Sequence, residues 1–225
     1  YSLDYHPRLS NSAATGGIAQ LENGLFQSSG TNPTNSSYTM TFPAEPFAAI
    51  RLDILPESED PKKWSALAAV CGDFHVHLIN PDGSRQRIGL KELIADSVSG
   101  PFDPNEGIRG GGPGFGDFPA QRGPRWCVIV PEQPVVPVAG AQLEIAIFHA
   151  LSCNADNQPS ILKRFKLSFS NNPVLQQFVS TPERGARWKE HGDLNAKYNS
   201  IPGTMIPVMK ERSAKARRDT RVFIR

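Results

Sequence analysis

A glycine-rich stretch of this sequence carries the side chains best suited to ligand binding. The candidate binding residues are Arg109, Phe115, Asp117, Phe118 and Arg122. Aromatic rings stack on the apolar faces of sugars, Asp and Arg hydrogen-bond hydroxyl or acidic groups, and a flexible loop lets them converge on one ligand. We therefore predict a binding loop here. The alternative is that Phe115 and Phe118 pack against the edge of the domain, with the arginines solvated or in contact with a neighbouring domain.

Two histidines, His75 and His77, lie two positions apart in a run of alternating apolar residues. On a β-strand this spacing places both side chains on one face, where they could hold a metal or move a proton. No HxxxH motif or carboxylate pair accompanies them to complete a metal site. A solvent-facing or hydrogen-bonded role is therefore favoured over metal ligation.

The segment FDPNEG offers oxygen ligands at short spacing, from Asp103, Asn105 and Glu106. Carboxylate, amide and carbonyl oxygens are the ligands that Ca²⁺ prefers in proteins. The pattern matches no complete calcium loop, so a polar turn is favoured over a structural Ca²⁺ site. No other cofactor is expected, and the sequence has no CxxCH motif for covalent haem.

Three cysteines, Cys71, Cys127 and Cys153, lie far apart and lack CxxC or Cys/His spacing, so no zinc site is predicted. Cys127 and Cys153 each adjoin a strand-like run, and one disulfide could join them. Buried free thiols are the favoured alternative, because an unpaired cysteine packs as a small hydrophobic residue.

Three tryptophans are further candidates for a surface on which a sugar could stack. Trp126 begins an apolar run and is expected in the core, and Trp188 is expected to dock a C-terminal helix. Trp64, which follows Pro61-Lys62-Lys63, is the one expected to be displayed.

Motifs and charge disfavour several classes of function. The sequence has no GxSxG, P-loop or HExxH motif, and paired carboxylates cannot be recognised before the fold is known. The net charge is +2, but seven basic and two acidic residues are concentrated in residues 210–225, so no uniformly basic face for nucleic acid is indicated. No apolar stretch reaches the roughly 18 residues that a membrane span needs. We therefore predict a chain that is not an enzyme, binds no nucleic acid and does not insert into membranes.

Short apolar runs separated by turns fill the first three quarters of the chain, which is rich in Gly (19) and Pro (20). Alternating apolar and polar residues are typical of half-buried strands, and Asn23-Gly24 and Asn80-Pro81-Asp82-Gly83 predict hairpin turns. Strands are expected on either side of Gly24 and at residues 37–42, 48–55, 73–80, 84–90, 125–130, 142–150 and 163–170.

Two intervening segments lack this alternation. One or two helical turns are expected over Leu90–Asp96, and residues 97–123 are expected to form a long irregular loop. Eight or nine strands with no helices between them predict an all-β fold, a two-sheet β-sandwich or jelly roll.

The pattern changes near Asn172, and we place a boundary there between a β-sandwich domain (1–172) and a connector (173–225). Thr181-Pro182-Glu183 supplies an N-cap, a first-turn proline and a first-turn acid, so a helix is expected to run to about Tyr198. The remainder is expected to be extended and basic and to lead into a following domain. Both ends of the chain read as cut from a longer protein.

The runs NGLFQSSGTNP, YTMTF, AAIRLDILP, CGDFHVHLIN and LKRFKLSFS, followed by YNSIPGTMIPVMKERSAKARRDTRVFIR, cover nearly the whole chain. Together they resemble the middle segment of planctomycete multidomain proteins, which carry a cytochrome c-like domain and planctomycete-specific domains of unknown function. The most specific part is Val208–Glu211 followed by Arg218–Arg225. The chain departs from the family pattern at Asn23-Gly24, where Asp-Gly is common, and in the loop at 107–123.

The resemblance implies a galactose-binding-like or lectin-like sandwich, a periplasmic, secreted or cell-envelope location, and a part in polysaccharide handling. The main hypothesis is therefore a noncatalytic module that binds polysaccharide or another glycan. The alternative is a structural spacer that organises flanking cytochrome-like and C-terminal domains of the same polypeptide. A polysaccharide-active enzyme is a third hypothesis.

Overall fold

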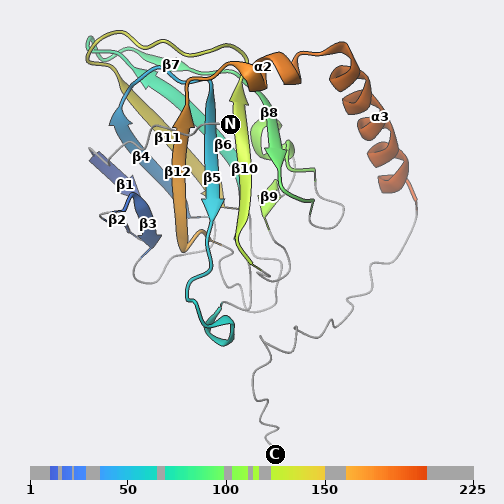
Figure 1. The fold of residues 1–225 in the computed structure, drawn as a ribbon, viewed down its shortest axis with the longest axis horizontal. Helices are drawn as coiled ribbons and strands as arrows, with labels where there is room; N and C mark the ends of the chain where they lie inside the picture. Colours follow the sequence, from blue (N-terminus) through green and yellow to red (C-terminus); the bar gives the residue numbers. More distant parts are fainter. Residues whose placement is uncertain are drawn as a thin grey trace, which may run out of the picture.

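A computed structural model describes residues 11–14, 17–21, 23–28, 36–64, 69–98, 103–110, 114–116, 123–149 and 161–201. These residues are mostly β-structure, with the longer helices at the C-terminal end (Figure 1). The strands are β1 (Asn11–Ala14), β2 (Ile18–Gln20), β3 (Leu25–Ser28), β4 (Ser37–Pro43), β5 (Ala49–Ile54), β6 (Val70–Ile79), β7 (Arg85–Arg87), β8 (Leu90–Ala95), β9 (Phe115–Gly116), β10 (Arg125–Pro131), β11 (Gln142–His149) and β12 (Arg164–Ser170). The helices are the 3-10 turn η1 (Pro61–Lys63), α1 (Glu106–Arg109), α2 (Val174–Val179) and α3 (Pro182–Asn199).

The strands form two sheets packed face to face, which confirms the predicted two-sheet β-sandwich. The first, which we call the β6 sheet, has the order β1-β4-β11-β6-β7, with β9 also paired to β6. The second, the β10 sheet, has the order β2-β3-β12-β5-β10-β8. Every pairing between the described strands is antiparallel. The chain crosses between the sheets several times, so residues distant in sequence become neighbours.

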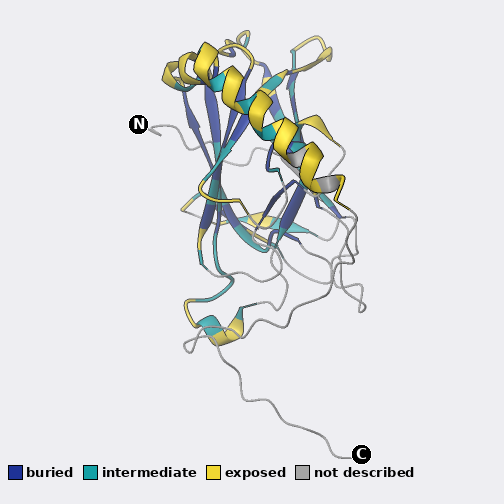
Figure 2. Cartoon of the chain, turned by 90° about the vertical axis from the view of Figure 1, so that its right-hand side faces the viewer, coloured by how far each residue is buried: buried dark blue, intermediate teal, exposed yellow. Residues whose placement is uncertain are grey.

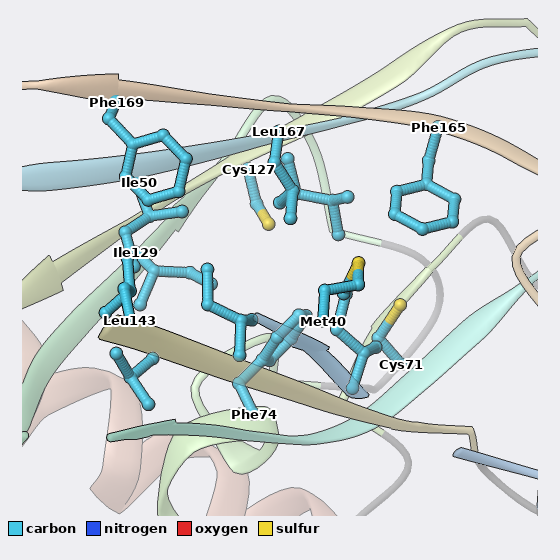
Figure 3. Packing of buried hydrophobic residues seen from close by; sticks show 14 of the residues in the cluster. Met40, Ile50, Cys71, Phe74, Cys127, Ile129, Leu143, Phe165, Leu167 and Phe169 are labelled. Atoms are coloured by element: carbon cyan, nitrogen blue, oxygen red, sulfur yellow. The ribbon is translucent and has the colours of Figure 1, made fainter. Parts of the chain in front are cut away.

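Alternating side chains fill the space between the sheets. In β5, Ile50 and Leu52 are fully buried, whereas Arg51 and Asp53 lie on the other face and pair with each other at 2.7 Å. Side chains from the two sheets point toward one another across the core in Figure 3, where residues such as Met40 and Phe74 face the β10 sheet. Burying large apolar side chains stabilises the fold by about 1.5–3 kcal/mol each.

The predicted hairpins are present because glycine occupies the turn position that other residues adopt poorly. Gly24, with φ of 75°, joins β2 to β3. Gly83, with φ of 82°, donates its N–H to the Asn80 carbonyl at 2.9 Å and lets β6 return as β7. Both dihedrals lie in the left-handed region that glycine enters without a steric penalty.

The prediction of a helical turn over residues 90–96 was wrong, because this segment forms β8. Its Leu, Lys, Glu and Ala residues favour helix, yet the backbone pairs with β10 from Leu90 to Ala95. Leu93 is buried in the core and Glu92 is 2% exposed. Long-range pairing and burial on both faces therefore override the local helical preference.

The long segment after β8 was predicted to lack regular structure, which was also wrong in part. It contains α1, and β9 pairs with β6 through Phe115 opposite Cys71 and Gly116 opposite Val70. Position 116 has no room for a larger residue, since a Cβ there would clash with the Ala69 carbonyl oxygen. Glycine therefore allows the short strand to approach β6.

A buried histidine at the end of β11 forms hydrogen bonds that hold the segment leading into β12. His149 Nδ1 lies 2.8 Å from the Ser36 carbonyl, and the N–H of Leu162 lies 3.0 Å from Nε2. A carbonyl can only accept and an amide N–H can only donate, so the ring is neutral with its proton on Nδ1. Burial lowers the pKa of His149 to about 4. Tyr38 stacks edge-on against the ring and donates its hydroxyl to the Leu162 carbonyl at 2.9 Å.

The last strand ends at Ser170, and α2 and α3 follow. Leu175 and Val179 of α2 pack with Ala49, Val128 and Val130 on the outer face of the β10 sheet. The predicted cap of the long helix is confirmed, since the Thr181 side chain accepts the Arg184 N–H and Pro182 begins α3. Figure 2 shows α3 as a largely exposed helix along one side of the sandwich.

No helix in the described part of the chain is long and apolar enough to cross a membrane. The predicted extended segment after residue 201 lies outside the described residues.

Candidate functional site

The structure places one of the predicted ring platforms inside the protein. Phe115 is 1% exposed and belongs to the main core cluster, so its ring presents no face to a ligand. This position corresponds to the alternative in which the ring packs against the sandwich. Arg109 is exposed at the end of α1. Asp117, Phe118 and Arg122 lie outside the described residues, so their part in a binding loop stays a prediction.

Arg125 was not singled out from the sequence, and it anchors segments on both sides of the glycine-rich loop. Its Nε donates to both carboxylate oxygens of Asp96 at 2.9 and 3.0 Å. Its Nη1 donates to the Gly116 carbonyl at 2.9 Å and its Nη2 to the Ser97 carbonyl at 2.7 Å. The guanidinium also lies 5.4 Å from the centre of the Phe115 ring. These contacts satisfy a buried charge that would otherwise be costly.

The residues considered for calcium are engaged in local structure. The Asp103 carboxylate accepts the Asn105 backbone N–H at 2.9 Å. The Asn105 amide is buried, accepts the N–H of Leu93 at 2.7 Å and donates to the Leu93 carbonyl at 3.1 Å. Burial, with a smaller effect of Asp103, raises the pKa of Glu106. Among the described residues no three His, Cys, Asp or Glu side chains are grouped to hold a metal.

Cys71 and Cys127 are free thiols buried in the core, one on each sheet (Figure 3). Their state confirms the favoured alternative for these two cysteines. Burial raises the pKa of both thiols well above the ordinary value. A thiol kept protonated and shielded from solvent is unreactive, so both act as packing residues. Cys153 lies outside the described residues.

The outer face of the β6 sheet gathers a polar cluster from β6, β7 and β11. We call it the polar face, and it consists of Asp73, His75, His77, Arg85, Glu144 and Phe148. Register creates it, because Glu144 lies opposite His77 and Phe148 lies opposite Asp73. Alternation then directs these side chains away from the core. His75 and His77 share this face as predicted, whereas their partners on β7 and β11 could not be read from local sequence.

Hydrogen bonds connect the members of the polar face. His75 Nε2 lies 2.9 Å from an Asp73 carboxylate oxygen, which confirms its predicted hydrogen-bonded role. Arg85 donates to Glu144 and lies 3.3 Å from His77 Nδ1. Burial first, and then the positive charge of Arg85, lower the pKa of His77 despite the opposing effect of Glu144. His77 is therefore neutral at pH 7, and its 3.7 Å contact with Glu144 is not a charged pair.

Phe148 adds an aromatic surface to the polar face. Phe148 is 37% exposed, although β11 is paired on both sides with β4 and β6, and its ring centre lies 4.9 Å from that of His75. An exposed ring beside hydroxyl-binding groups is a common arrangement in sugar-binding sites, where stacking and hydrogen bonding act together. Nothing in the sequence around Phe148 distinguishes it from the aromatic residues of the core.

Each tryptophan ring contacts a specific neighbouring group, through a hydrogen bond for Trp64 and through an arginine over the ring for Trp126 and Trp188. Trp64 is half-buried, and its indole N–H donates to the Ser58 carbonyl at 2.6 Å, so the expected free display is not observed. Trp126 was expected in the core. It is half-buried on the outer face of the β10 sheet, with the Arg51 guanidinium 5.0 Å from its ring centre. Trp188 lies in α3 and docks it, as predicted.

The contact between α3 and the sandwich, which we call the α3 seam, is built around Trp188. The guanidinium groups of Arg109 and Arg184 each lie 5.5 Å from the centre of its ring. Arg184 also forms an ion pair with the buried carboxylate of Glu92 on β8. The His191 ring meets the indole edge to face at 5.5 Å. A helix of modest apolar character is thus held through charge and aromatic contacts.

Comparison with known proteins finds no family model that matches the chain, and no curated protein shows a significant match to it. The resemblance noted from the sequence therefore stays a prediction.

Proposed function

We propose that the chain is a noncatalytic polysaccharide-binding module and that the polar face is its binding surface. The observation that carries this proposal is the half-exposed ring of Phe148 beside the hydrogen-bonded His75–Asp73 pair. Sugars present an apolar face of C–H groups and a rim of hydroxyls, so they need both kinds of contact at once.

Five members of the polar face have a role that suits a hydroxyl-rich ligand. Phe148 offers its ring to a sugar face. Asp73 and Glu144 accept hydrogen bonds from hydroxyl groups, Arg85 donates them, and His75, whose Nε2 proton goes to Asp73, accepts at Nδ1. Existing bonds such as Arg85–Glu144 hold these groups in place before a ligand arrives, so less side-chain entropy is lost on binding.

The shape of the surface also favours a polymer. The polar face extends over three neighbouring strands of one sheet, β7, β6 and β11. An open face lets a long chain lie across the strands without its ends being confined. The resemblance to envelope proteins adds a cell-envelope setting and a polysaccharide ligand to the proposal.

Affinity electrophoresis in gels containing neutral or acidic polysaccharides tests this function. We expect the protein to be retarded by at least one polysaccharide, and Phe148→Ala to weaken that binding about 10-fold, as loss of roughly 1.4 kcal/mol of stacking implies. The matched control is Tyr198→Ala, which removes an exposed aromatic ring from α3 and should leave binding unchanged. Retardation by none of the polysaccharides, or equal losses in both variants, would remove the proposal.

A structural spacer is the second candidate, and the α3 seam favours it. The Arg184–Glu92 ion pair and the stacking on Trp188 hold α3 against the sandwich, which would fix the direction in which a following domain leaves. Arg184→Met should release α3 and increase hydrogen exchange along it. If exchange in α3 of the unaltered chain is already as fast as in an unfolded peptide, the helix cannot serve as a rigid spacer.

A further inference from the structure

The α3 seam has hydrogen-bonding capacity that its docking role does not use. Trp188 Nε1 and His191 Nδ1 are shielded from solvent, and neither has a hydrogen-bond partner within the described part of the chain. A shielded N–H without an acceptor costs about 1–3 kcal/mol, and such groups are rare in folded proteins. The Trp188 indole can only donate, so an acceptor is missing beside it, and the unpartnered His191 Nδ1 lies on the ring that touches the indole.

The residues around these nitrogens are cationic and rich in donors. Trp188 and His191 lie three positions apart in α3 and so share one side of the helix. The Arg109 guanidinium lies over the Trp188 ring from α1, across the seam. An indole N–H can only donate, a guanidinium can only donate, and an imidazole can place its proton on Nδ1. The complementary ligand is one that offers only acceptors.

Glu106, three positions before Arg109 on α1, forms no ion pair with it within the described residues, and the acidic groups of β8 and α3 also leave Arg109 available. Glu92 is already paired with Arg184, which neutralises that guanidinium. Arg109 forms no ion pair within the described residues. Glu190 and Asp193 are exposed on α3, and helical periodicity turns them away from the side that carries Trp188. A positive charge with unused donors therefore borders the two shielded nitrogens.

We propose that the α3 seam binds an oxyanion, a carboxylate or sulfate group, through Arg109, Trp188 Nε1 and His191. Guanidinium groups recognise such anions through parallel charge-assisted hydrogen bonds. The anion bridges α1 and α3, so its binding also strengthens the docking of the connector. The ligand is either a free inorganic anion or the acidic substituent of a polysaccharide. This site is separate from the polar face.

The indole N–H signals of the ¹⁵N-labelled chain provide the test. The sequence has three tryptophans, and titration with sodium sulfate should shift the Trp188 indole signal in a saturable way. The Trp64 signal should not move, because its N–H already donates to a backbone carbonyl. Sodium chloride at the same ionic strength should give no saturable shift. A Trp188 signal that does not respond to sulfate would overturn the proposal.

Variants distinguish a specific sulfate site from nonspecific attraction of sulfate to positive charge. Arg109→Gln and His191→Phe should each weaken sulfate binding about 10-fold or more, the loss expected for one hydrogen bond to a charged group. Lys189→Gln removes a positive charge from the exposed side of the same helix and should have no effect. Equal weakening by Lys189→Gln would contradict the proposal. The Trp64 and Trp126 signals report whether each variant is folded.

A second arm distinguishes the source of the anion. An oligogalacturonate and a sulfated oligosaccharide are compared with free sulfate on the same Trp188 signal. Tighter binding of either oligosaccharide identifies an acidic glycan as the ligand, and binding no tighter than that of free sulfate identifies the inorganic anion. Phe148→Ala should not change these results, so failure of the polar face and failure of the α3 seam are distinguishable.

Discussion

Acidification should destabilise this fold through His149. The ring is neutral in the folded chain because both nitrogens are committed, Nδ1 to the Ser36 carbonyl and Nε2 to the Leu162 N–H. Its pKa falls from 6.5 to about 4 on folding. One pKa unit corresponds to about 1.4 kcal/mol, so the full shift is worth about 3 kcal/mol.

The sign follows from which state binds the proton. Between pH 6.5 and pH 4 the unfolded chain protonates this histidine and the folded chain does not, so the free energy of unfolding falls as the pH falls. The stability that depends on a neutral His149 is fully present above pH 6.5 and is lost progressively between pH 6.5 and pH 4. Below pH 4 the loss does not grow further. About 2 kcal/mol should be lost by pH 4.5.

Urea denaturation followed by circular dichroism at pH 7, 6, 5 and 4.5 measures this loss. His149→Gln cannot titrate and should be less stable at pH 7, yet its stability should depend less on pH by the amount attributed to the histidine. His75→Gln, on the sheet surface, is the control for loss of a histidine. The reasoning is refuted if His149→Gln keeps the pH dependence of the unaltered chain, or if an NMR titration gives His149 a pKa near 6.5.

Other contacts give further expected outcomes. Arg125→Met should lower the free energy of unfolding by about 3 kcal/mol in urea, because a buried pair is broken, whereas the more exposed Arg51→Met should cost less than about 1 kcal/mol. Glu92→Gln should speed hydrogen exchange in α3 and leave exchange in the central strands unchanged, and unchanged exchange in α3 would contradict the role of the Arg184–Glu92 ion pair in the α3 seam. Cys71 and Cys127 should resist a thiol reagent until the chain unfolds, and mass spectrometry showing either modified in the native protein would show that burial does not protect it.

The alternating strands and the caps were predictable because each carries its signal within a few residues. Ile50 and Leu52 alternate with charged neighbours, and Thr181-Pro182 starts a helix by local chemistry. The β8 strand was not predictable, since its residues favour helix and only pairing with β10 makes it a strand.

The sites depend on contacts across the sequence. The His75 and His77 pair was visible, but Glu144 joins it only through the register of β11 on β6. Arg109 was selected for a loop and in fact contacts α3, more than seventy positions later, through Trp188. Such partners are set by the assembly of the sheets and connector, and no short motif encodes them.

The amide of Asn105 has a consequence for how copies of this chain meet. By holding both the N–H and the carbonyl of Leu93, it occupies bonds along the outer edge of β8 that another molecule's strand would need. An open edge is a starting point for fibril growth, in which strands add one after another. At β8 the Asn105 side chain takes the pair of outward bonds at Leu93, which makes this edge a poorer template for strand addition than an edge left fully open.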